Sequence, residues 1–221
     1  MLLKRAIKAA ARVDSQQASF MAKPFLDAAG SGMHIHVSLV DKSGKNVFGE
    51  TGSKGETLLR QAIAGLQAAM PESMAIFGAN LNSFRRYQPG HNVPITPAWG
   101  NNNRSVAFRI PAGGGPARRI EHRVAGADAN PYLVMAAVLA GMLHGIEERL
   151  TPTPETKGDA GDDADPKVPF EFTAAVERLA KAKILPRYVA PDMLDLLRDQ
   201  RRAEMHKFMG VISRQEYDWY L

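Results

Sequence analysis

The 221-residue sequence contains no cysteine. Disulfide bonds and thiol chemistry are therefore excluded, and a bound metal ion would need His, Glu or Asp ligands. No stretch approaches the roughly 20 apolar residues of a membrane span, and the first residues lack the apolar core and cleavage site of a signal peptide. These absences predict a cytoplasmic protein with no membrane partner.

The sequence also lacks a basic run, although its formal net charge is +5 and its pI is near 9.5. The arginines are scattered through otherwise neutral segments, so we do not expect a nucleic-acid partner. Planar guanidinium groups in such positions favour small anions such as phosphates and carboxylates, which they bind in a bidentate manner. With 45% hydrophobic residues, the chain can bury a sizeable core.

Residues 30–39 carry the clearest pattern, Gly-Ser-Gly-Met-His-Ile-His-Val-Ser-Leu. Side chains alternate on a β-strand, so His34, His36 and Ser38 share one face while the apolar residues between them share the other. Adjacent imidazoles suit a divalent metal ion or an anion, and the glycines allow backbone N–H groups to approach a phosphate closely. Two hydrogen-bonded structural histidines explain the pattern equally well.

Residues 119–124, Arg-Ile-Glu-His-Arg-Val, show the same alternation. Arg119, Glu121 and Arg123 are predicted to share one strand face. A plain salt-bridge ladder is the simpler interpretation of a carboxylate between two guanidinium groups. Alternatively, Glu121 and a histidine bind a hard divalent cation, while the arginines neutralise a phosphate and a substrate carboxylate.

Periodicity, capping patterns and turn residues predict the remaining elements. Helices are expected at residues 2–13, from Ser53 to Met70, from Pro71 to about Gly78, and at 131–146, 171–184, 191–209 and 213–221; strands are expected at 33–40, 47–48, 104–110 and 118–124. The helix at 131–146 is apolar nearly all round, which predicts a place in the core. Residues 80–103 are expected to form a long irregular binding loop, and residues 151–169 an exposed acidic loop.

Three segments, in this order, resemble the carboxy-terminal catalytic domain of the glutamine synthetase family. They are Lys-Pro-Phe…Gly-Ser-Gly-Met-His-x-His-x-Ser-Leu, Asn-Ser-Phe-x-Arg…Pro-Gly…Pro…Asn-Arg-Ser…Arg-Ile-Pro, and Arg-Arg-Ile-Glu-x-Arg…Asn-Pro-Tyr-Leu. The resemblance is strong from about Phe20 to Tyr132 and looser through the helical tail. It implies an α+β fold, with a mainly antiparallel sheet flanked by helices, related to the guanidino kinase catalytic domain and lacking the family's amino-terminal β-grasp domain. We expect residues 1–221 to form part of one catalytic domain, sheet-rich over 14–130 and helical over 131–221.

The family's reaction is a two-step ligation, in which ATP phosphorylates the γ-carboxylate of glutamate and an amine attacks the γ-glutamyl phosphate. The resemblance implies these roles: His34 and Glu121 as ligands of Mg²⁺ or Mn²⁺; His36, Ser38, Arg104, Arg109 and Arg119 as ATP contacts; Gly30, Arg86 and Arg123 as glutamate contacts; and Arg104 and Asn92 as catalytic positions. Such roles agree with phosphoryl transfer, which depends mostly on positioning and on neutralisation of charge.

Two departures from the family pattern bear on the substrates. Asn92 stands at the position of the glutamate that binds and deprotonates ammonium in ammonia-using members, and a neutral amide can do neither. The Arg-Tyr-Gln-Pro-Gly sequence at 86–90 is similar to relatives that join glutamate to putrescine or other polyamines. A γ-glutamylamine ligase is therefore favoured over an ammonia-using glutamine synthetase. Ala29 replaces the asparagine that usually precedes Gly-Ser-Gly, which bears on the acid substrate.

The family's remaining metal ligands, a Glu-x-Glu strand and two further glutamates, have no counterpart before His34, where the chain has only Asp14 and Asp27. Two protein ligands do not make a cage of several oxygens. We therefore expect this chain to be inactive alone and the ligase activity to belong to the complete protein. Family members form double-ringed dodecamers, which implies a homo-oligomer for that protein. A truncated, non-catalytic scaffold is the alternative, and a phosphotransferase related to guanidino kinases has the least support.

Overall fold

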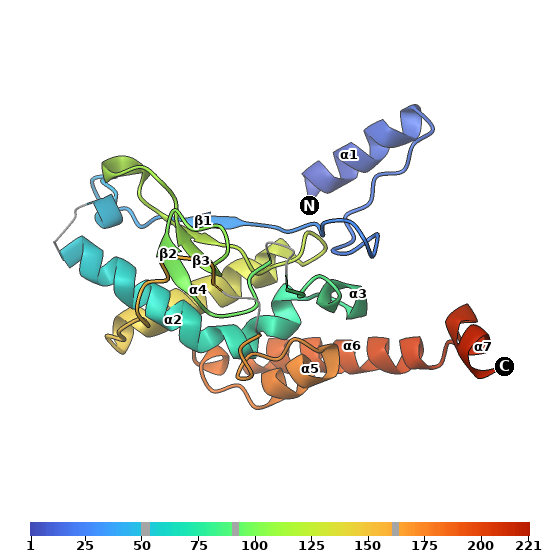
Figure 1. The fold of residues 1–221 in the computed structure, drawn as a ribbon. Helices are drawn as coiled ribbons and strands as arrows, with labels where there is room; N and C mark the ends of the chain where they lie inside the picture. Colours follow the sequence, from blue (N-terminus) through green and yellow to red (C-terminus); the bar gives the residue numbers. More distant parts are fainter. Residues whose placement is uncertain (50–53, 90–92, 161–163) are drawn as a thin grey trace.

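The computed structural model describes residues 1–49, 54–89, 93–160 and 164–221 (Figure 1). Its four-stranded sheet has the order β1-β4-β3-β2. The strands are β1 (Ile35–Val37), β2 (Trp99–Asn101), β3 (Phe108–Ile110) and β4 (Ile120–His122). Strand β4 pairs antiparallel with both β1 and β3, whereas β2 pairs parallel with β3. The expected α+β class with a mainly antiparallel sheet is confirmed.

Two long helices, α2 (Lys54–Phe77) and α4 (Pro131–Glu147), pack against each other beneath one face of the sheet (Figure 1). They approach so closely that a Cβ atom added to Gly145 would overlap the backbone of α2. The Asn130 side chain accepts a hydrogen bond from the Tyr132 N–H at 3.0 Å and so caps α4, as its sequence predicts. Ile63, Met74, Phe108, Ile120 and Val138 belong to the core between these layers.

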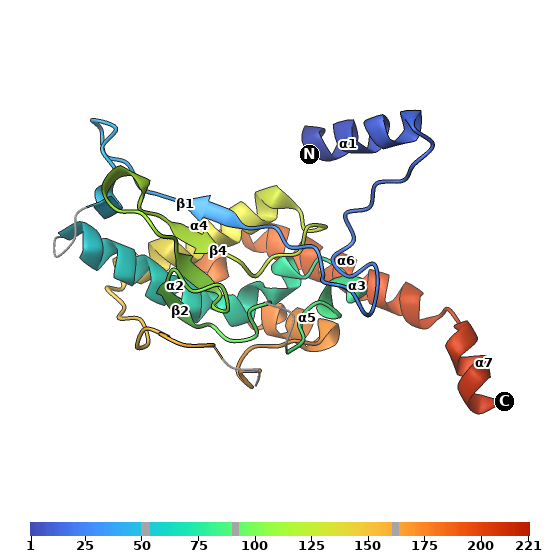
Figure 2. The same ribbon diagram turned by 45° about the horizontal axis from the view of Figure 1, so that its top comes forward.

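The carboxy-terminal part consists of α5 (Phe172–Ala180), a 3₁₀ turn η3 (Leu185–Arg187), α6 (Pro191–Met209) and α7 (Arg214–Tyr220). Helix α5 packs against α2, and α6 packs against α5. The Glu216 carboxylate accepts a hydrogen bond from the Ser213 N–H at 2.6 Å, which confirms the predicted cap of α7. Helices α1 (Leu2–Val13) and α7 both project from the body (Figures 1 and 2). Within the described ranges, no helix combines the length and apolar character needed to cross a lipid bilayer.

The predicted break at Pro71 is wrong, because this proline lies inside α2. Proline cannot donate the helical hydrogen bond, which normally ends or kinks a helix. Pro71 and its neighbours on this part of α2 are buried, and the apolar packing of these residues offsets the lost bond. The predicted cap residue Ser53 lies outside the described residues.

Two of the shorter elements also differ from expectation. Residues Val47–Gly49 form a 3₁₀ turn, η1, and not a strand, although the bridge between Val40 and Asn46 confirms the turn between them. The segment 80–103 contains a short helix, α3 (Leu81–Phe84), and strand β2. The segments around α3 and β2 are rich in Asn, Pro and Gly and show too little periodicity to be recognised in the sequence.

Burial also corrects one prediction. Helix α4 is buried on one side only, since Tyr132, Met135, Leu139 and Leu143 form an exposed stripe. The irregular segment after α4 is attached to β2, because the Thr156 N–H donates to the Trp99 carbonyl at 2.9 Å and the Trp99 indole N–H donates to the Thr153 carbonyl at 2.7 Å. This segment therefore pairs with backbone groups of β2 that would otherwise form an open edge.

Candidate functional site

Polar side chains from three neighbouring strands meet on the face of the sheet opposite α2 and α4. The register places Glu121 of β4 beside His36 of β1 on one side and beside Arg109 of β3 on the other. Because side chains alternate, the apolar partners of these residues face the helices. The alternation predicted for residues 33–39 is confirmed, since His34, His36 and Ser38 are the exposed members of that segment.

Glu121 lies at the centre of this face and is only 3% exposed. Its Oε2 atom accepts a hydrogen bond from Arg109 Nη1 at 2.6 Å, and its Oε1 atom accepts one from Arg123 Nη1 at 2.7 Å. Burial acts to raise the pKa of Glu121, but the hydrogen bonds from the two arginines outweigh it and hold the pKa below its ordinary value. Glu121 is therefore an ionised carboxylate at neutral pH.

His34 Nδ1 lies 3.0 Å from Glu121 Oε1. Burial, followed by the charge of Arg123, lowers the pKa of His34 below its ordinary value, so the ring is neutral at pH 7. A neutral imidazole carries its proton on one ring nitrogen and keeps a lone pair on the other. That lone pair is the type of donor that binds a divalent metal ion.

His36 and Arg119 form a second contact beside this cluster. Arg119 Nε donates to His36 Nδ1 at 3.0 Å, and Arg119 Nη1 donates to the Ala117 carbonyl at 2.8 Å. The expected salt-bridge ladder consisted of Arg119, Glu121 and Arg123. This expectation is corrected, because Arg109, and not Arg119, pairs with Glu121. The alternation of one strand cannot reveal which residue its neighbour brings alongside, and no signal in the sequence indicated Arg109 as the partner.

Arg86 lies just after α3 and is buried beneath the turn that leads into β1. Its Nη1 atom donates to the Val124 carbonyl at 2.7 Å. A Cβ atom on Gly32 would lie 2.6 Å from Arg86 Nη2, and one on Gly30 would lie 2.9 Å from Arg86 Cγ. Glycine is needed at these two positions because the arginine side chain passes against their backbone and, at Gly30, a Cβ atom would also lie 2.7 Å from the Ala22 carbonyl oxygen.

Most of the residues predicted for the site thus come together. Arg86 and the glycine turn lie beside His34, and His34 contacts the Glu121 cluster. Arg104 is exposed, and in the described part of the chain no hydrogen bond or ion pair joins it to this cluster. Asn92, the other predicted catalytic position, lies outside the described residues.

Both interpretations of the charged face retain support. The ion pairs of Glu121 with Arg109 and Arg123 are those of a salt-bridge ladder. Glu121 and His34 together offer a carboxylate oxygen and an imidazole nitrogen, which suit Mg²⁺ or Mn²⁺. Among the residues that the structure describes, no third His, Cys, Asp or Glu side chain joins them to form a metal-holding group. The pair therefore fits part of a metal site.

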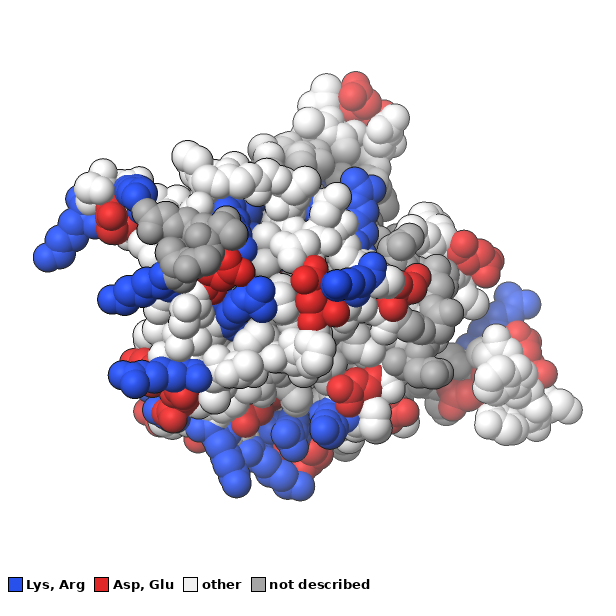
Figure 3. Space-filling model, turned by 60° about the vertical axis from the view of Figure 1, so that its left-hand side comes forward, with Lys and Arg blue, Asp and Glu red and all other residues white. Residues whose placement is uncertain are grey.

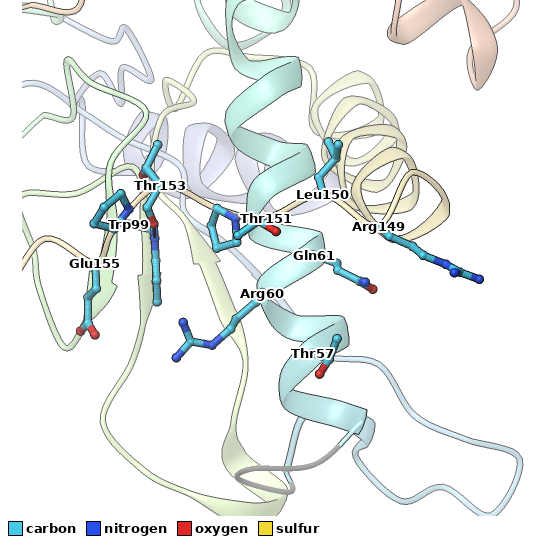
Figure 4. A pocket seen from close by; sticks show the side chains of 11 residues that line it. Thr57, Arg60, Gln61, Trp99, Arg149, Leu150, Thr151, Thr153 and Glu155 are labelled. Carbon is cyan, nitrogen blue, oxygen red and sulfur yellow. Dashed lines mark hydrogen bonds between the residues drawn. The ribbon is translucent and has the colours of Figure 1, made fainter.

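A separate pocket of about 380 Å³ lies at the β2 edge of the sheet (Figure 4). None of the predicted site residues that the structure describes lines it. In Figure 4, Arg60 of α2 reaches toward Trp99 and Glu155, whereas Arg149 points away from them. The Arg60 guanidinium lies 5.4 Å from the centre of the Trp99 ring and also pairs with Glu56 at 3.1 Å. Arg60 is thus already held by groups of this chain.

Figure 3 shows the face of the molecule that lies at the left of Figure 1. Lys and Arg side chains are interleaved there with Asp and Glu side chains. On the described part of this face no single sign of charge dominates, so it does not present the continuous basic surface typical of nucleic-acid binding.

The fold and the site define an α+β domain with a cluster of charged side chains on one face of its sheet. Comparison with known families agrees, since residues 1–220 match the glutamine synthetase catalytic domain. The chain belongs to the glutamine synthetase family.

Two curated relatives illustrate the similarity. The chain is 40% identical over 221 residues to the gamma-glutamylputrescine synthetase PuuA of Escherichia coli K12, covering 100% of this chain and 47% of that protein. It is 32% identical over 218 residues to the gamma-glutamylethanolamide synthetase GlnA4 of Streptomyces coelicolor, covering 99% of this chain and 46% of that protein.

Among solved structures, GmaS without ligand has a TM-score of 0.85 at 28% identity and matches 97% of this chain and 50% of that chain. A GmaS complex with ADP also has a TM-score of 0.85, at 26% identity, and matches 99% of this chain and 52% of that chain. The chain thus spans about half the length of the relatives that it matches.

Proposed function

We propose that the complete protein containing this chain is an ATP-dependent ligase that joins the γ-carboxylate of glutamate to an amine through γ-glutamyl phosphate. The supporting observation is the Glu121-centred cluster, found in a chain 40% identical to a gamma-glutamylputrescine synthetase. The protein is further proposed to be cytoplasmic and to act as a homo-oligomer.

Glu121 and His34 are the residues of this chain that would hold Mg²⁺ or Mn²⁺, because one is ionised and the other keeps a free lone pair at neutral pH. The metal ion would neutralise charge on the phosphates of ATP. Arg109 and Arg123 flank the same carboxylate and are proposed to bind a phosphate and the acid substrate. Their cationic forks are already oriented by Glu121, so substrate binding costs little reorganisation.

The nucleotide is proposed to lie along β1, where His36 and Ser38 are exposed next to Arg119. Glutamate is proposed to bind at the Gly30 turn, between Arg86 and Arg123. Asn92 supports an amine larger than ammonia, since a neutral amide neither attracts ammonium nor accepts its proton. Gamma-glutamylputrescine and gamma-glutamylethanolamide synthetases among the relatives support the same preference.

A non-catalytic scaffold is the second candidate. It is supported by the small number of possible metal ligands, because the described part of the chain brings together two of them, His34 and Glu121. The same observation applies to a ligase whose other ligands come from outside this chain, so activity of the complete protein separates the two candidates.

The test is phosphate release by the complete protein with ATP, Mg²⁺, glutamate and one amine at a time. We expect putrescine, spermidine or a monoamine to exceed ammonia in kcat/KM by at least about tenfold, because a larger amine contributes binding energy of its own. The 221-residue chain alone should show no turnover. Efficient use of ammonia would refute the amine preference, and no phosphate release with any amine would favour the scaffold.

A further inference from the structure

Helix α3 lies between the proposed glutamate-binding arginine and a carboxylate, Asp128, that belongs to no part of the site described above. Asp128 Oδ2 accepts hydrogen bonds from Asn80 Nδ2 at 2.9 Å and from Ser83 Oγ at 2.8 Å. Asn80 and Ser83 in turn cap the start of α3, because Asn80 Oδ1 accepts the Ser83 N–H at 3.1 Å and Ser83 Oγ accepts the Asn80 N–H at 3.2 Å.

A helix of four residues is not stable in isolation, so its position is set by its contacts. The Ser83 hydroxyl has one proton, and by giving that proton to Asp128 it turns a lone pair toward the Asn80 N–H. The Asn80 amide is held in the same way, with its NH₂ group on Asp128 and its oxygen on Ser83. One carboxylate oxygen therefore orients both capping side chains.

The far end of α3 is attached to the same stretch of chain. Arg86 Nη1 and the Tyr87 hydroxyl both donate to the Val124 carbonyl, at 2.7 Å and 3.2 Å. Val124 therefore contacts the residues that follow α3, and Asp128 contacts the residues that cap its start. In the middle of the helix, the Asn82 side chain accepts the Lys23 N–H at 3.0 Å and donates to the Lys23 carbonyl at 2.8 Å, which fastens the segment leading to the Gly30 turn.

We propose that Asp128 is a positioning residue that fixes α3 and thereby places the Arg86 guanidinium against the Gly30–Gly32 turn, where the acid substrate is recognised. The inference rests on the proposed function for its consequence in catalysis. The Arg86 side chain lies against the backbone of both glycines, since a Cβ atom on Gly32 would lie 2.6 Å from Arg86 Nη2. Loss of the Asp128 contacts releases the start of α3 and therefore shifts the guanidinium through the helix.

The first test uses the 221-residue chain and needs no activity. Hydrogen exchange of the arginine Nε–H groups is measured by NMR in Asp128→Ala. We expect the Arg86 Nε–H to exchange at least about tenfold faster, because local release of α3 opens its buried environment. Arg109 on β3, whose Nε–H is likewise buried without a hydrogen-bond partner among the described residues, is the internal control and should change less than about twofold.

Asp128→Asn should restore Arg86 exchange to within about threefold of the natural chain, because its amide oxygen still accepts both hydrogen bonds. Ser83→Ala removes one of those bonds, so the Arg86 Nε–H should exchange at an intermediate rate. If Asp128→Ala does not fold, Ser83→Ala is the variant that tests the proposal. Unchanged Arg86 exchange in Asp128→Ala or, failing that, in Ser83→Ala would overturn the proposal. Equal acceleration at Arg86 and Arg109 would also overturn it, because that result indicates global loosening.

The second test uses the complete ligase. Asp128→Ala is expected to raise KM for glutamate about tenfold while changing kcat and KM for ATP less than about threefold, since only the acid-binding arginine is displaced. The double variant Arg86→Lys/Asp128→Ala should have nearly the same KM for glutamate as Arg86→Lys alone. An equal loss in all three parameters, or full additivity, would refute the positioning role. If the unaltered protein shows no ligase activity, the proposed function fails while the exchange measurement still decides the role of Asp128.

Discussion

The two faces of β4 and the residues that follow it differ in chemistry, since one packs in the core and the other carries the charged cluster. Toward the helices, Ile120, His122 and Val124 are buried, and the His122 ring lies between Phe77 and Phe108 at centroid distances of 4.5 Å and 5.5 Å. Within the described part of the chain, neither ring nitrogen of His122 has a hydrogen-bond partner. On the other face, Glu121 has three charged or polar partners within 3.0 Å.

The contrast between His122 and His34 shows what burial does to one residue type. Burial lowers the pKa of His122 to about 3, so this ring is an uncharged part of the core. His34 lies near it on the opposite face, keeps contact with solvent and meets the ionised Glu121. The inner face contributes stability through apolar packing, and the outer face holds charge in a defined arrangement.

The largest expected effect is on the outer face. Glu121→Gln in the complete protein should lower kcat by about a thousandfold, equivalent to roughly 4 kcal/mol, because the proposed metal loses a charged ligand and two arginines lose their counter-ion. Steady-state phosphate release measures this change. Glu155→Gln is the matched control, since Glu155 accepts hydrogen bonds from Asn101 away from the cluster and should leave kcat within about twofold. Equal rates for the two variants would contradict a special role for Glu121.

The next effect is on the layer beneath the inner face. Gly145→Ala places a methyl group against the backbone of α2, which cannot move aside as a flexible side chain would. We expect the free energy of unfolding to fall by about 3 kcal/mol in urea titrations. Gly158→Ala meets no atom within 4 Å and should change stability by less than about 0.5 kcal/mol. Similar midpoints for both variants would show that the close approach of α2 and α4 is not required.

The third prediction concerns pH. His122 is neutral when folded down to about pH 3 but binds a proton below about 6.5 when unfolded, so stability must fall as the pH is lowered through this window. Between pH 6.5 and 5, the loss attributable to His122 should be about 2 kcal/mol. Urea unfolding at several pH values measures it. His122→Leu should flatten this dependence, whereas His34→Asn should retain most of it; an unchanged slope in His122→Leu would contradict the prediction.

The smallest effect is expected at the edge of the outer face. Arg119→Gln breaks the contact with His36 and should raise KM for ATP about threefold to fivefold, with less than about 1 kcal/mol change in stability, because the pair is open to solvent. Arg198→Gln removes a half-buried α6 arginine that pairs with Asp195 and serves as the control. If both variants have the same KM for ATP, Arg119 is not a nucleotide contact.

Local patterns predicted the parts of this protein that depend on local geometry. Alternation placed His34 and His36 on one face of their strand, and the Asn130-Pro131 pair marked the start of α4; both are confirmed. Local patterns failed at Pro71, because a buried apolar face keeps α2 continuous through a residue that usually ends a helix. The pairing of Arg109 with Glu121 was also missed, since it depends on the register between two strands.

Family membership and the polar character of the outer face could thus be predicted from the sequence alone, because motifs and strand alternation depend on neighbouring positions. The tertiary structure alone decided which arginines contact Glu121, where the Arg86 side chain passes the glycine turn, and how Asp128 reaches the cap of α3. These contacts join distant residues, for example 45 positions apart for Ser83 and Asp128 and 48 for Asn80 and Asp128. Such pairs are set by strand register and helix packing, which no single segment encodes.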